Sequence, residues 1–140
     1  MRAAASSILA LDVGDARVGV AVASLIARLP RPLTTLKNDD SVFEEILRLA
    51  SSEDTGLIVV GLPRGLDGQH TKQTESAEAF AHQLGQHVSL PVHLQDEALT
   101  SRKAEAELEA RGKPYDKGDI DALAATYILE DFLRDYREDV

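Results

Sequence analysis

Acidic side chains stand at the ends of several predicted elements, where they could meet and do chemistry. Asp12 lies inside an apolar stretch, residues 8–15, that is typical of a strand buried on both faces. A carboxylate buried alone in such a strand is costly unless it is paired, neutralised or bound to a cation. Asp12 is therefore the first candidate for a functional residue. The other acids end the predicted strand at 92–97 or open the predicted last helix: Asp96, Glu97, Asp119 and Asp121.

Carboxylates gathered in one cleft imply a bound cation. Three of them within about 4 Å would repel by about 4 kcal/mol per pair at an effective dielectric constant near 20. Oxygen ligands in a chain without cysteine favour Mg²⁺ or Mn²⁺ over zinc. Such clusters commonly hold two ions about 3.5–4 Å apart and serve phosphoryl chemistry. The residue types thus predict a two-ion site that hydrolyses phosphodiester bonds.

The same acids also have structural interpretations that the residues alone leave open. Asp119 is placed to be the N-cap of the last helix, and an acid in the first turn of a helix, such as Asp121, is favoured by the helix dipole. Asp96 could be a solvated strand end, and spacing does not choose between it and Glu97. His70 lies in a loop that should face the same cleft.

The elements that must position these acids follow the order of an α/β fold. Three strands come first, and strand–helix–strand units follow, which imply right-handed crossovers and parallel pairing. This order predicts one domain over residues 1–140, a mixed five-stranded sheet with helices on both faces, which is the architecture of the ribonuclease H-like class. The expected strands lie within residues 8–15, 17–23, 30–37, 57–61 and 92–97. The first two expected helices lie at 42–52 and 71–87, the third runs from a cap at residue 100 or 101 up to residue 112, and the last begins near residue 119.

Helix-end signals refine these bounds. Ser41 and the acid three residues later have the spacing of a capping box. Thr71 is expected to open the second helix, and Thr100 or Ser101 to cap the third. Gly112 is expected to end the third helix.

Composition narrows the function classes. The net charge of −9 argues against a general polyanion binder with a basic surface, although bound cations reverse the sign of a carboxylate cluster locally. The lack of cysteine excludes disulfides and fits a reducing cytoplasm. No apolar stretch reaches membrane-spanning length, and Asp12 and Asp15 interrupt the N-terminal run that could resemble a signal peptide.

Four segments, in order, resemble the YqgF family, compact bacterial proteins of the ribonuclease H-like superfamily that are similar to Holliday junction resolvases. The segments lie within residues 12–21, 60–68, 96–100 and 121–125, and the likeness runs from about residue 8 to residue 133. The resemblance implies a nuclease that matures the 5′ end of pre-16S rRNA.

The resemblance also assigns roles to single residues. It implies that Asp12 is the first catalytic acid, Glu97 the second and Asp121 the third, all of them metal ligands. It therefore selects Glu97 over Asp96, and Asp121 over Asp119.

The chain departs from the family pattern at a few positions. Ala98 stands where the family usually has an arginine, and Asp15 and Ala16 stand where it usually has a threonine and a basic residue. Gly118 occupies a position where resolvase relatives often carry a fourth acid or a histidine. The extra Asp15 could join the metal shell or weaken the approach of substrate.

The leading hypothesis is a nuclease dependent on Mg²⁺ or Mn²⁺, cytoplasmic, acting on RNA in preference to DNA. Its partners would be nucleic acid and ribosomal precursor particles, with no membrane, and it would be a monomer or homodimer. Candidate phosphate contacts are Arg17, Arg64, Lys72, Arg102, Lys113 and Lys117.

Other classes of function remain open from the sequence. One is a resolvase of Holliday junctions or other branched DNA. Another is a non-catalytic nucleic-acid-binding module for ribosome assembly, which the net acidity and Ala98 favour. An actin-type ATPase is disfavoured because it needs two such domains, which 140 residues cannot supply.

Overall fold

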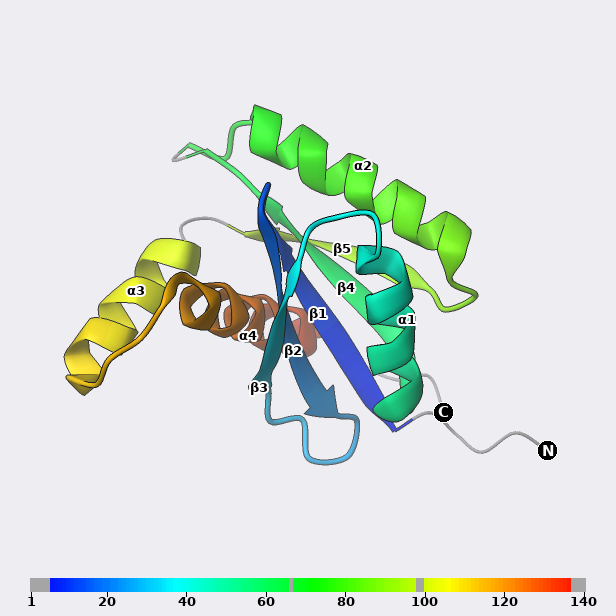
Figure 1. The fold of residues 1–140 in the computed structure, drawn as a ribbon, viewed down its shortest axis with the longest axis horizontal. Helices are drawn as coiled ribbons and strands as arrows, with labels where there is room; N and C mark the ends of the chain where they lie inside the picture. The colour runs from blue at the N-terminus through cyan, green and yellow to red at the C-terminus, as the bar shows by residue number, and fades with distance from the viewer. Residues whose placement is uncertain (1–5, 66, 98–99, 137–140) are drawn as a thin grey trace.

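The elements follow the predicted order of three strands, a helix, a strand, a helix, a strand and two helices (Figure 1). A computed structural model describes residues 6–65, 67–97 and 100–136. The strands are β1 Ser7–Val13, β2 Arg17–Ser24, β3 Arg31–Lys37, β4 Thr55–Pro63 and β5 Val92–Glu97. The helices are α1 Val42–Ser52, α2 Lys72–His87, α3 Thr100–Arg111 and α4 Lys117–Asp135.

β1 is the central strand of the sheet, whose order is β3-β2-β1-β4-β5. It pairs antiparallel with β2, where Asp12 lies opposite Gly19, and parallel with β4, where Leu11 lies opposite Val60. β5 is parallel to β4. Because β1, β4 and β5 run in one direction, their carboxyl ends lie at the same edge of the sheet, and Asp12 and Glu97 come to that edge with them. The mixed five-stranded sheet predicted from the sequence is confirmed.

Alternate residues of β1 face two different hydrophobic cores. Leu9 and Leu11 pack in the core that includes α1 and α2, whereas Ile8 and Ala10 pack in the core that includes α4. Figure 1 shows α1 and α2 to one side of the sheet and α4 crossing its other side, with α3 beside α4. Both faces of β1 are therefore buried, which is why its sequence is apolar without alternation.

Two helix ends agree with the sequence signals, whereas the capping box expected at a third is absent. Thr71 is the N-cap of α2, and Gly112, with φ of 70°, follows the last residue of α3. The capping box predicted at Ser41 is wrong, because the Ser41 hydroxyl donates to the Asp39 carboxylate (2.8 Å) and caps no backbone group. A nearby carboxylate competes for the hydroxyl of a capping serine. α3 begins at Thr100, and the residues before it lie outside the described ranges, so the cap at Thr100 or Ser101 stays a prediction.

The start of α4 also differs from the prediction. The helix begins at Lys117, and its N-cap is Asp116 rather than Asp119. Asp116 accepts from the backbone N–H of Asp119 (2.9 Å), and Asp119 accepts from that of Asp116 (3.0 Å). This reciprocal capping box satisfies two backbone donors at once, which explains why the helix starts before Asp119. Within the described ranges, no helix has both the length and the apolar character needed to cross a membrane.

Candidate active site

Asp12 lies near the end of the central strand, at the floor of a cleft of about 630 Å³. The residue is only partly exposed. Burial of its carboxyl group, together with the negative charge of Asp121, raises the pKa of Asp12 to about 7. Asp12 is thus held where its ionised form is disfavoured unless a cation is near.

Asp121 reaches the same cleft from α4, because α4 packs directly on the backbone of β2. A Cβ atom at Gly19 would lie 2.0 Å from the Asp121 carbonyl oxygen, so only glycine allows this close approach. The Arg17 Nε–H donates to the Asp121 carboxylate (2.6 Å). This ion pair joins β2 to α4 and fixes the orientation of the Asp121 side chain.

Glu97, the last residue of β5, is buried, with 9% of its surface exposed. Burial, followed by the hydrogen bond and charge of Asp131 on α4, raises the pKa of Glu97 to about 9. Among the described residues, its Oε1 atom has no hydrogen-bond partner. Glu97 lines the cleft with Asp12 and Asp121, but its carboxyl group interacts with Asp131.

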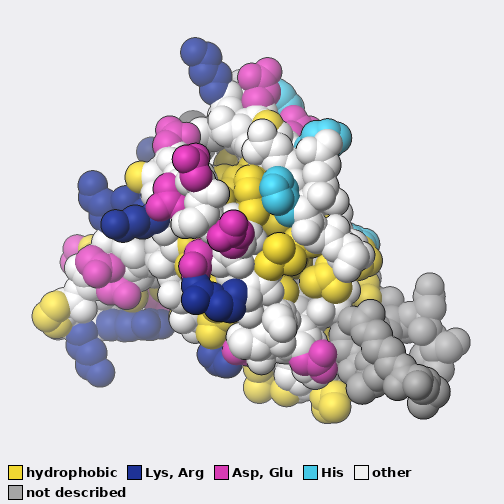
Figure 2. Space-filling view, turned by 45° about the vertical axis from the view of Figure 1, so that its right-hand side comes forward, with side chains coloured by type: hydrophobic (Ala, Val, Ile, Leu, Met, Phe, Trp, Pro, Cys, Tyr) yellow, Lys and Arg dark blue, Asp and Glu magenta, His cyan; other side chains and the backbone are white. Residues whose placement is uncertain are grey.

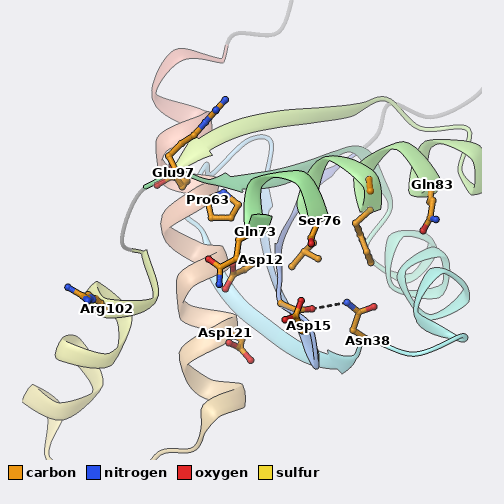
Figure 3. A pocket seen from close by; sticks show the side chains of 15 residues that line it. Asp12, Asp15, Asn38, Pro63, Gln73, Ser76, Gln83, Glu97, Arg102 and Asp121 are labelled. Atoms are coloured by element: carbon orange, nitrogen blue, oxygen red, sulfur yellow. Dashed lines mark hydrogen bonds between the residues drawn. The ribbon is translucent and has the colours of Figure 1, made fainter. Parts of the chain in front are cut away.

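The three acids therefore share one cleft without forming a closed cluster. Figure 3 shows Asp12 and Asp121 on neighbouring elements, with Glu97 farther along the cleft at the end of β5. In the described part of the chain, no group of three or more Asp, Glu, His or Cys side chains is placed to hold a metal ion. The donor set still suits a hard cation, because all its ligands are oxygens and the buried Oε1 of Glu97 lacks a partner.

The predicted basic residues divide between different places. Arg64 and Arg102 line the cleft. Arg64 also forms an ion pair with Asp96 near the end of β5, with the Arg64 Nη2 atom 3.1 Å from the carboxylate. Arg17 is held by Asp121 rather than free in the cleft.

The three lysines lie elsewhere. Lys113 lines a separate hollow beside Pro32 and Tyr115. Lys72 and Lys117 are the exposed first residues of α2 and α4. Of the six candidate phosphate contacts, the structure thus brings Arg64 and Arg102 to the lining of the cleft that holds the acids.

Other residues considered in the sequence have local partners. His70 Nε2 lies 2.8 Å from a carboxylate oxygen of Glu78, so this histidine pairs with α2. The Gly118 carbonyl accepts from the Thr35 hydroxyl (2.6 Å), an anchor between α4 and β3. Ala98 lies outside the described residues.

The polar wall of the cleft is not predicted by the sequence patterns. Asp15 is conspicuous in the sequence, but Asn38, Gln73, Ser76 and Gln83 also line the cleft. The side-chain amide of Asn38 donates to the Gly14 carbonyl (2.7 Å), which holds the turn after β1 (Figure 3). The helical spacing of the α2 residues is a usable signal, but only the packing of α2 shows which of its faces meets the acids.

Comparisons with known proteins agree with this architecture. A family model described as "RuvX: Holliday junction resolvase" matches residues 6–135. A protein of Chloroflexus aurantiacus named "Putative pre-16S rRNA nuclease" is 42% identical over 130 residues, covering 90% of this chain and 85% of the relative. A protein of Haemophilus ducreyi with the same name is 38% identical over 130 residues, covering 90% and 94%.

A solved structure supports the fold independently of close sequence likeness. The structure described as T. thermophilus RuvC in complex with Holliday junction substrate superposes with a TM-score of 0.52 and 16% sequence identity. The match covers 92% of this chain and 94% of that one. The ribonuclease H-like fold expected from the sequence is confirmed.

Proposed function

The chain belongs to the RuvX (YqgF) family, and on that premise we propose that it is a divalent-metal-dependent nuclease that hydrolyses phosphodiester bonds in RNA. In the cytoplasm it would mature the 5′ end of pre-16S rRNA, since relatives that align with most of this chain are named for that precursor. The observation that carries the proposal is the single cleft lined by Asp12, Glu97 and Asp121, which come from three elements far apart in the sequence.

Asp121 is close enough to Asp12 for its charge to raise the pKa of Asp12, as expected of carboxylates that share a cation. Glu97 would add a third oxygen ligand through its unpartnered Oε1 atom. Two Mg²⁺ or Mn²⁺ ions, when bound, supply activation of the attacking water and stabilisation of the leaving oxygen. Arg17 would keep the Asp121 carboxylate oriented towards the cleft.

The phosphate groups of the substrate need a counter-charge in a chain whose net charge is −9. Arg102 on α3 and Arg64 after β4 are the basic side chains on the cleft wall. Figure 3 shows Arg102 on α3, to one side of Asp12 and Asp121. We assign both arginines to contacts with the phosphates next to the bond that is cut.

The test compares neighbouring acids that differ in their proposed role. Asp121→Asn and Glu97→Gln should each lower Mn²⁺-dependent cleavage of a labelled pre-16S rRNA fragment by at least 100-fold. A loss of this size is expected when a metal ligand, or a residue that orients one, is removed. Asp119→Asn and Asp96→Asn replace a neighbouring carboxyl group by an amide in the same way and should retain most of the activity. Equal losses in the two sets would contradict the assignment.

A junction-cutting activity is the second candidate, because the matching family model is described as a Holliday junction resolvase. A four-way DNA junction should therefore be assayed beside the RNA fragment under the same Mn²⁺ concentrations. Faster cleavage of the junction than of the RNA would identify branched DNA as the substrate, and the roles proposed for the three acids would stay the same.

A non-catalytic binding module is favoured by one observation, the lack of a closed three-acid cluster in the described residues. Such a module would bind RNA but would yield no product with either metal. Its thermal stability would also not respond to Mn²⁺, whereas ions bound to the folded state alone raise the stability of a nuclease.

A further inference from the structure

One face of α2 borders the cleft and carries neutral hydrogen-bonding groups. Gln73, Ser76 and Gln83 are exposed and line the same cleft as the three acids. Their spacing of three and seven residues places them on one side of a helix. Figure 3 shows them extending from α2 in this order, with Gln73 at the end of the row towards Asp12 and Gln83 at the other end. We call these three residues the α2 amide face.

The carboxylates of the first half of α2 lie off this face. Glu75 and Glu78 occupy other sides of the helix. Lys72, four residues before Ser76, lies at the start of the helix and does not line the cleft. Figure 2 shows a largely uncharged surface in the upper right part of the view, where histidine side chains gather. In an acidic chain, the absence of carboxylates along one wall leaves a path on which a polyanion is not repelled.

The side chains of the α2 amide face are also unengaged. Within the described residues, none of the three makes a side-chain hydrogen bond, in contrast to Asn38 on the facing turn. A glutamine side chain offers two N–H donors and a carbonyl oxygen that can accept two hydrogen bonds, and a serine hydroxyl can both donate and accept. These are the groups that bind base edges and ribose hydroxyls, whereas phosphates are mostly bound by Lys and Arg.

We propose that the α2 amide face is a binding subsite for a single nucleic-acid strand that runs away from the acids. The inference rests on the nuclease function proposed above and adds the class of substrate that the cleft accepts. Gln73 and Gln83 are ten residues apart, so they are separated by about 15 Å along the helix axis. At about 3.4 Å per stacked nucleotide, the face spans about four nucleotides.

A single strand, rather than a duplex, fits these contacts. In a double helix the Watson–Crick edges are paired, and RNA duplexes present mainly ribose and phosphate groups to a protein. An unpaired strand leaves its base edges free for amides, and glutamine can bind adenine through a donor and an acceptor together. The subsite would therefore select an unpaired end or loop next to the bond that is cut.

The test measures strand binding by fluorescence anisotropy with a labelled 12-nucleotide RNA and the DNA of the same sequence. The chains are the parental protein, Gln73→Ala, Gln83→Ala and the matched control Gln86→Ala. Gln86 is an exposed glutamine of the same helix that lines a different hollow. Binding is measured in EDTA, and again with Mg²⁺ on chains that also carry Asp12→Asn so that the strand is not cut.

Each of the two cleft glutamines should weaken binding about fivefold when it is replaced, which is the effect of one neutral hydrogen bond. Gln86→Ala should bind within twofold of the parental protein. The slope of affinity against salt should stay unchanged in the glutamine variants, because neutral contacts release no counterions. Arg102→Ala should instead reduce that slope by about 0.7.

The outcomes separate this inference from the proposed function. Binding of both strands at parental affinity by Gln73→Ala and Gln83→Ala, or an equal loss in Gln86→Ala, would overturn the inference alone. A parental protein that binds neither RNA nor DNA would overturn the proposed function and the inference with it. Circular dichroism spectra equal to that of the parental protein would show that the exposed alanines leave the fold intact, so that a loss of affinity reports on the contact.

Discussion

Replacing Asp12 by asparagine should stabilise the metal-free protein while abolishing cleavage. Burial and the charge of Asp121 raise the pKa of Asp12 from 3.8 to about 7. Below about pH 4 the group is largely protonated in both the folded and the unfolded state, so it has little effect on stability. As the pH rises from 4 through 7, the unfolded chain loses this proton first, and the folded state becomes progressively less stable. The asparagine variant is free of this loss.

The size of the effect follows from the pKa difference. A shift of about three units corresponds to about 4 kcal/mol above pH 7, at 1.36 kcal/mol per unit. Asp12 is partly exposed, and water screens its charge, so we expect about half of this, roughly 2 kcal/mol. For a chain of this length, 2 kcal/mol corresponds to a rise in Tm of about 8 °C.

The assay is thermal unfolding in EDTA, followed by circular dichroism at pH 5 and pH 8. The gain for Asp12→Asn should be less than half as large at pH 5, because most of the pKa interval lies above that pH. Asp15→Asn is the matched control, since it removes an exposed carboxylate from the same cleft. A variant that is no more stable than the parental protein at pH 8, or that gains equally at both pH values, would refute the reasoning.

Three further outcomes are expected. Gly19→Ala should destabilise the protein by at least about 3 kcal/mol in urea unfolding, because the new Cβ atom would overlap the Asp121 carbonyl. Its control is Gly85→Ala on α2, where the space around the residue is open, and this variant should be more stable than the parental protein by up to about 1 kcal/mol. Glu97→Gln should raise the free energy of unfolding by at least about 1 kcal/mol at pH 8, with a gain that grows from pH 4.5 to 9, since the pKa of Glu97 is raised to about 9. Saturating Mn²⁺ should raise the Tm of the parental protein by several degrees but not that of Asp12→Asn; equal shifts in both chains would place the ion elsewhere.

Much of the fold could be predicted because its signals are local. The apolar run at residues 8–11 indicates a doubly covered strand, and β1 is indeed buried against helices on both faces. The helix at Thr71 and the end at Gly112 follow from capping and from positive φ, which depend on neighbouring residues. The errors at Ser41 and Asp119 are also local. Asp39 accepts the Ser41 hydroxyl that was expected to cap α1, and Asp116 takes the N-cap position that spacing alone gave to Asp119.

The candidate site could be predicted only in part. Asp12 is conspicuous because a carboxylate in an apolar strand has a cost that the sequence itself reveals. The ion pair of Arg17 with Asp121 joins residues 104 positions apart, and it exists because Gly19 lets α4 pack on β2. No local pattern contains that information.

The sequence by itself determined the types and order of the elements, the family, and which acids could matter, since these depend on hydrophobic periodicity and residue identity. Only the tertiary structure decided that Glu97 interacts with Asp131, that Arg17 is held by Asp121, and that one face of α2 borders the acids. The reason is physical: a side chain's partners are set by how helices cross the sheet, and that crossing results from packing summed over the whole chain.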